Sequence, residues 1–164
     1  MKLIVAGLAL VAVACWGSGC GGSSAEATYL SRVAAVLREA KTAHDAVPPP
    51  ALNSDNTLDA AEQASIEERL RAVADTVSTA IGGLTALKAP APFASEQRDA
   101  IAALADERLQ LLGVAGQPLD TPGSLTDALD QRVQPARNRF KAACQRLQVE
   151  ATTRNVDVTM ECDL

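Results

Sequence analysis

The sequence predicts an all-α protein, a four-helix up-down-up-down bundle with a short extended C-terminal tail folded back on the last helix. Of the 164 residues, 32 are alanine and only 2% are aromatic, a composition that favours helices over strands. Four segments carry apolar residues at steps of three and four, which is the helical period. Short or proline-marked connections join them and favour antiparallel neighbours.

Residues 1–19 have the layout of an export signal. Met1-Lys2 gives a short positive start, and residues 3–14 contain no polar side chain. This run is shorter than the roughly 20 apolar residues that a membrane-spanning helix needs. We therefore expect a cleaved signal peptide. Residues 20–24 are expected to form a Gly/Ser tether, and residues 25–164 the helical domain.

Gly17-Ser18-Gly19-Cys20 resembles the end of a bacterial lipoprotein signal, in which a small-residue box precedes a cysteine. The resemblance implies that Cys20 receives a diacylglyceryl group and becomes the mature N-terminus. Gly17 departs from the usual Leu of that box. Two alternatives stay open, namely acylation of Cys15 and plain secretion after cleavage at Ala12-Val13-Ala14.

The number of cysteines favours Cys20 as the lipidation site. If Cys20 is acylated, Cys15 leaves with the signal, and Cys144 and Cys162 remain as a pair. If Cys15 is acylated instead, Cys20 is an odd thiol in an oxidising compartment. The protein is thus expected to be exported and held by its N-terminal lipid, on the outer face of the plasma membrane or the inner leaflet of an outer membrane.

The first two helices are expected at residues 25–47 and 58–88. The first places Tyr29, Val33, Val36, Leu37 and Ala40 on one face, and Pro48-Pro49-Pro50 ends it. The second carries the most regular stripe, formed by Ile66, Leu70, Val73, Val77, Ile81, Leu84 and Leu87. Because this stripe continues past Gly82-Gly83, the glycines predict a bend or a close helix contact there.

The third and fourth helices are expected at residues 93–112 and from Ser124 onward, with a loop between them. The third turns Phe93, Ile101, Leu104, Ala105 and Leu111 inward. The fourth is expected to begin at Ser124 with Asp127 as cap partner, and Pro135 should kink it. Its inward stripe is Leu125, Leu129, Val133, Ala136, Phe140, Ala143 and Leu147.

The tail is expected to return along the last helix. Asn155 tolerates the left-handed conformation that ends helices, and residues 156–161 alternate apolar and polar side chains like a strand. The helix climbs ~15 Å from Cys144 to Arg154, and an extended chain returns ~20 Å. The two cysteines can therefore meet, and their disulfide should stabilise the fold by about 3 kcal/mol.

The segments 143–148 and 155–162 resemble the C-terminal end of small Ala-rich lipoproteins from high-GC bacteria, and residues 87–93 are similar to their mid-chain helix connection. That group is largely uncharacterised. The resemblance implies an exported helical bundle with a C-terminal disulfide, and it implies no activity.

Candidate chemistry is sparse, and we expect no enzyme, cofactor or metal. His44 and Asp45 stand near a helix end, where a cationic or hydrogen-bonding His is the structural interpretation. Residues 53–59 lack the Gly and Glu of a calcium loop and are interpreted as helix caps. Three carboxylates that a di-metal site would use, Glu62, Glu67 and Glu68, have no Glu-x-x-His partners.

The net charge of −5 argues against a nucleic-acid partner. The function expected from the sequence is a structural or protein-interaction module of the cell envelope, with an envelope protein as the partner. The alternative is a helical bundle that holds a small apolar ligand.

Overall fold

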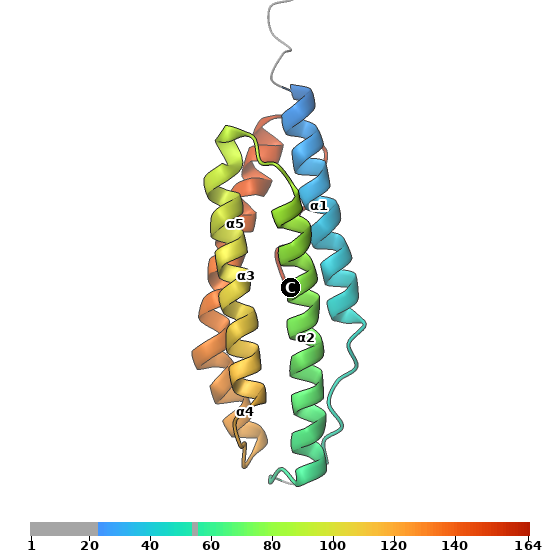
Figure 1. The fold of residues 1–164 in the computed structure, drawn as a ribbon, viewed down its shortest axis with the longest axis vertical. Helices are drawn as coiled ribbons and strands as arrows, with labels where there is room; N and C mark the ends of the chain where they lie inside the picture. Colours follow the sequence, from blue (N-terminus) through green and yellow to red (C-terminus); the bar gives the residue numbers. More distant parts are fainter. Residues whose placement is uncertain (1–22, 54–55) are drawn as a thin grey trace, which may run out of the picture.

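The computed structural model describes residues 23–53 and 56–164, and all regular secondary structure in these ranges is helical. The predicted all-α class is therefore correct. Four long helical segments lie side by side (Figure 1). They are α1 (Ser23–Asp45), α2 (Ala60–Ala86), α3 (Ala94–Ala115) and a composite last helix of α4 (Pro122–Ala128), η2 (Leu129–Val133) and α5 (Gln134–Thr153), and a short η1 (Ala91–Phe93) precedes α3.

Helix α1 begins at Ser23, two residues before the expected start of the helical domain. The last two residues assigned to the tether therefore have helical backbone. The signal peptide, Cys15 and Cys20 lie outside the described residues. The expected apolar face is buried at Tyr29, Val33, Leu37 and Ala40, while Val36 packs partly against the core.

Helix α2 begins with a capping box. The Asp59 carboxylate accepts hydrogen bonds from the backbone N–H groups of Ala61 and Glu62, at 2.8 and 2.9 Å. The Glu62 carboxylate in turn accepts from the Asp59 N–H at 2.9 Å. These bonds satisfy amide groups that the first helical turn leaves unpaired. The interpretation of residues 53–59 as helix caps is confirmed at Asp59.

Helix α2 runs without interruption through Gly82 and Gly83, and the second glycine marks a close helix contact. A methyl group at Gly83 would lie 2.7 Å from Cγ1 of Val36 on α1, whereas Gly82 faces open space. The absence of a side chain at Gly83 therefore lets α1 approach α2.

Helix α3 extends three residues beyond its expected end and continues through Gly113 to Ala115. The expected inward position of Ala105 is wrong, because this residue is exposed. Leu104 and Leu111 are buried as expected, and two polar residues that the apolar pattern did not include, Gln97 and Glu107, are buried with them.

The last helix begins at Pro122, and its cap is Thr121 where Ser124 was expected. The Thr121 hydroxyl accepts from the Ser124 N–H at 3.1 Å, and the Ser124 hydroxyl accepts from the Thr121 N–H at 3.2 Å. Asp127 is not the cap partner. Ahead of Pro135 the chain makes the π-helical turn η2, in which the Gln134 N–H donates to the Leu129 carbonyl. Since proline has no N–H, this wider turn absorbs the break in the hydrogen-bond ladder.

The chain leaves helix α5 at Asn155, which has a left-handed φ of 55°. The Val156 N–H then donates to the Ala151 carbonyl at 2.9 Å, which closes the helix end. Residues 156–164, called the tail below, form no helix and no strand. The main helix packing is α1 on α2, α2 on α3 and α3 on α5, while α1 touches α5 over a small area.

Candidate functional site

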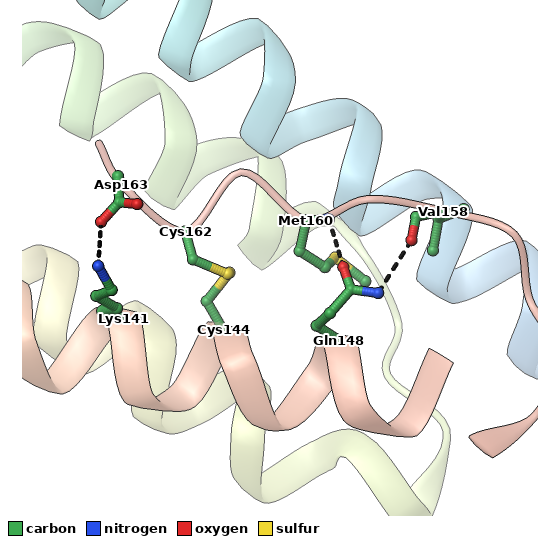
Figure 2. The surroundings of a disulfide bond; sticks show 7 residues. All are labelled: Lys141, Cys144, Gln148, Val158, Met160, Cys162 and Asp163. Carbon is green, nitrogen blue, oxygen red and sulfur yellow. Dashed lines mark hydrogen bonds and ion pairs between the residues drawn. A yellow bond between two sulfur atoms is a disulfide. The ribbon is translucent and has the colours of Figure 1, made fainter. Parts of the chain in front are cut away.

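The tail is held on α5 by a disulfide and by side chains on both sides of it (Figure 2). Cys144 on α5 is bonded to Cys162 in the tail, with 5.5 Å between their Cα atoms. Gln148, one turn further along α5, donates to the Val158 carbonyl at 3.0 Å and accepts from the Met160 N–H at 2.7 Å. Lys141 pairs with Asp163 at 2.7 Å. The pair of cysteines singled out by the sequence therefore lies within a polar attachment that the sequence did not reveal.

A cleft of about 250 Å³ opens beside the attached tail. It is lined by Gln134, Arg137, Asn138, Phe140, Lys141, Cys162, Asp163 and Leu164. Both cations in this cleft are already paired, Lys141 with Asp163 and Arg137 with Glu107. The cleft therefore offers amide groups and shielded charges, and no reactive group.

A polar cluster adjoins this cleft through Arg137, and we define it as Glu107, Arg137 and His44. Glu107 on α3 is completely buried, and its Oε1 accepts from Nε of Arg137 on α5 at 2.7 Å. Its Oε2 is buried with no hydrogen-bond partner among the described residues. Burial raises the pKa of Glu107, and the hydrogen bond and charge of Arg137 oppose that rise.

His44, in the last turn of α1, is the third member of the polar cluster. Its Nδ1 is buried without a partner in the described part of the chain. Burial lowers the pKa of His44, and the positive charge of Arg137 lowers it further. These effects favour the neutral imidazole, so the expectation of a cationic His at the helix end gains no support. Neighbouring Asp45 is exposed and pairs with Lys41 at 2.8 Å.

An aromatic contact joins three elements at the opposite end of the bundle. The rings of Tyr29 on α1 and Phe93 in η1 stack at 5.3 Å, and the guanidinium of Arg154 lies 4.9 Å from the Phe93 centroid. Arg154 also pairs with Glu26 on α1 at 3.0 Å. Burial, with a smaller contribution from Glu96, raises the pKa of Tyr29 to about 12. The phenol stays neutral at physiological pH, and the contact holds the helix ends together.

Two of the remaining carboxylates considered in the sequence, Glu62 and Glu67, have structural roles. Glu62 completes the cap of α2 and also accepts from the Asn53 N–H, and Glu67 pairs with Arg71. Across the described residues, no group of three or more His, Cys, Asp or Glu side chains is placed to hold a metal ion. None of the helices in the same ranges has the length and apolar character to cross a membrane.

Burial of Glu107 was not predicted from the sequence, although the sequence contains a signal for it. Glu107 stands three residues after Leu104 and four before Leu111, so it interrupts the buried stripe of α3 with a charge. A charged residue at such a position needs a partner from another helix. The sequence does not identify Arg137 as that partner, because the pairing depends on the register between α3 and α5.

Comparison with protein families, with curated proteins and with solved structures finds no match to this chain.

Proposed function

We propose that this chain is an exported, lipid-anchored protein of the cell envelope, whose helical domain serves as a structural or protein-interaction module. The lipid is carried by Cys20, and the domain meets a partner protein through a helix face. It binds neither nucleic acid nor cofactor and is not an enzyme. Its host, on this proposal, is a bacterium of the kind that makes small Ala-rich lipoproteins.

The bonded pair Cys144–Cys162 is the observation that carries the export part of this proposal. Disulfides persist in oxidising compartments and are rare in the cytosol. The apolar run at residues 3–14 and the small residues before Cys20 have the layout of an export signal, which agrees with an oxidising compartment.

The proposal includes a definite arrangement of the domain, in which the four helices run up-down-up-down and the tail returns along α5. The order of helix packing, α1 on α2 on α3 on α5, supports it. The bonds from Gln148 to the tail and the ion pair Lys141–Asp163 support the returning tail. Such a domain is a rigid rod with long side faces.

An interaction role fits the surface better than a ligand-binding role. The core positions are filled by Ala, Leu, Val and Phe side chains, and the cleft beside the tail is lined largely by polar and charged groups. Two large apolar side chains, Leu109 and Val149, are 64% and 62% exposed on the outer surfaces of α3 and α5. No observation on the described residues favours the alternative of a small apolar ligand.

The anchor is tested with Cys20→Ser and with Cys15→Ser as its matched control, both made in the full chain in a bacterial host. We expect Cys20→Ser to abolish membrane retention and Cys15→Ser to leave it unchanged. The intact mass of the wild type should correspond to residues 20–164 with an acylated N-terminus and no alkylatable thiol. The reverse pattern would assign the lipid to Cys15, and retention of both variants would contradict lipid anchoring.

A further inference from the structure

The outer surface between α3 and α5 has a regular arrangement of charge. Asp99 and Asp106 stand two helical turns apart on α3, and Arg139 and Arg146 stand two turns apart on α5. They pair across the two helices, Asp99 with Arg146 at 2.9 Å and Asp106 with Arg139. All the acids of this set therefore lie on α3 and all the bases on α5.

An open groove of about 610 Å³ runs between the two ion pairs. Ala102 and Ala103 from α3 and Ala142 from α5 line it, so a facing helix could approach closely. Leu109 is two turns along α3 from Ala102, and Val149 is two turns along α5 from Ala142. This surface therefore combines three alanines, two ion pairs between α3 and α5, and two exposed apolar side chains. We call it the α3–α5 face.

We propose that the α3–α5 face binds a second copy of this chain, related to the first by a two-fold axis parallel to the helices. This inference rests on the interaction role proposed above and names its partner. Rotation about such an axis places α3 of one copy over α5 of the other without changing the level along the helix. Since Asp106 is level with Arg139, and Asp99 with Arg146, each acid of one copy then faces a base of the other. The interface is isologous, as in most homodimers.

The charges within each copy do not oppose this pairing. The four side chains are between 37% and 62% exposed, and a guanidinium carries five N–H donors, enough to serve two carboxylates. An axis perpendicular to the helices would instead place α3 over α3 and set acid against acid. Charge therefore selects one orientation of the second copy.

The selected orientation also agrees with an anchor at the N-terminus. The chain enters α1 at one end of the bundle (Figure 1), and an axis parallel to the helices leaves these ends of both copies on the same side. Both copies could then stand on one membrane. Two helices of α3's length, 22 residues, present about 600 Å² per copy. That area is at the low end for a specific interface, and tethering to a membrane raises the effective concentration that such an interface needs.

Charge reversal tests the proposal. The double variant Arg139→Glu/Arg146→Glu makes the whole face acidic, and Asp99→Arg/Asp106→Arg makes it basic. Combining all four changes swaps the two rows and restores every pairing, both within a copy and between copies. The full chain is purified from whichever fraction holds it. Its association is measured by sedimentation velocity and, on phosphatidylglycerol vesicles, by chemical crosslinking.

We expect the wild type and the four-residue swap to form dimers, and each double variant alone to be monomeric. An equimolar mixture of the two double variants should dimerise again. Circular dichroism and cooperative unfolding establish that every variant is folded, so loss of the pairs within one copy cannot produce this pattern. A fourth variant, Ala102→Arg in the middle of the groove, should also be monomeric.

Three results would overturn the proposal: a wild type that is monomeric both in solution and on vesicles, a double variant that dimerises as the wild type does, or a folded swap that stays monomeric. A partner of different sequence would not recognise the swapped face, so dimerisation of the swap separates self-association from other binding. Membrane retention of both cysteine variants would contradict only the proposed function, because association is measured on the purified chain.

Discussion

Glu107 introduces a carboxylate into the centre of the helix packing, where a single guanidinium satisfies one of its two oxygens. Removal of the partner should therefore be costly, because it leaves a buried charge uncompensated. We expect Arg137→Met, which keeps the apolar stem, to lower the free energy of unfolding by about 3 kcal/mol at pH 7. The control Arg139→Met, at an exposed pair, should lose less than about 1 kcal/mol. Urea unfolding measures both.

The loss in Arg137→Met should depend on pH in a defined direction. Burial raises the pKa of Glu107 in the folded state above its unfolded value. Its contribution to stability is then complete below the unfolded pKa and is lost as pH rises through the folded pKa. Arg137→Met should therefore be least destabilising in acid, and adding Glu107→Gln should recover most of the loss at pH 7. Equal losses at pH 4.5 and pH 7 would contradict a buried carboxylate at this position.

His44 should act in the opposite direction. The pKa of His44 is lowered, first by burial and then by Arg137. The stabilising free energy linked to its neutral form is therefore fully present above the unfolded pKa of about 6.5. That contribution is lost as pH falls through the lower folded pKa. We expect the wild type to lose free energy of unfolding relative to His44→Gln between pH 7 and pH 5. Above pH 7, the free energies of unfolding of the two chains should change with pH in parallel. Parallel changes down to pH 5 would disprove a lowered pKa of His44.

At the scale of the elements, the packing of α1 on α2 depends on one missing methyl group. Gly83→Ala would bring a methyl carbon within 2.7 Å of Cγ1 of Val36, so the Val36 side chain or the helices themselves must shift. We expect a loss of about 1–3 kcal/mol in the free energy of unfolding. Gly82→Ala is the matched control, since its methyl would enter open space, and it should gain about 0.5–1 kcal/mol from helix propensity. Thermal unfolding of both variants measures these changes. Similar losses of unfolding free energy in the two variants would disprove the close contact at Gly83.

The tail is an element held by one covalent bond and a few polar contacts. Cys144→Ala/Cys162→Ala should lower the free energy of unfolding by about 3 kcal/mol and expose residues 156–164 to proteolysis. Gln148→Ala keeps the disulfide and loses only two hydrogen bonds to the tail, so we expect about 1–2 kcal/mol. Peptide mapping without reduction should recover the two cysteines in one linked pair of peptides. Two separate alkylated peptides would rule out the disulfide.

Local sequence patterns predicted these elements well where the signal was itself local. The apolar stripe of α2, the end of α1 before its prolines and the left-handed Asn155 each depend on neighbours a few positions away. The start of the last helix was predicted at the wrong residue, because Thr121 and Ser124 are both good caps and Pro122 favours the earlier one. The exposed position of Ala105 was also missed, since alanine is small enough for either face of a helix.

At the scale of the whole molecule, the all-α class followed from composition and period, whereas the contacts between helices did not. The pairs Glu107–Arg137 and Asp99–Arg146 depend on how α3 and α5 are aligned along their axes. That alignment is set by side-chain packing over the full length of both helices, and no short motif encodes it. The proposed α3–α5 face was invisible in the sequence for the same reason.

Helix α1 begins at Ser23, only three positions after Cys20, and with the proposed lipid on Cys20 this short separation would set the height of the domain above the membrane. Three residues span about 10 Å at most, so a lipid on Cys20 would hold the base of the domain against the headgroups. Helix α2, with 27 residues, extends about 40 Å. At the N-terminal end of α2, the Leu58 N–H donates to the Asp120 carbonyl at 3.0 Å. This bond connects the loop before α2 to the loop between α3 and α4. On a lipid-anchored protein, these two connected loops would then lie roughly 40 Å above the bilayer.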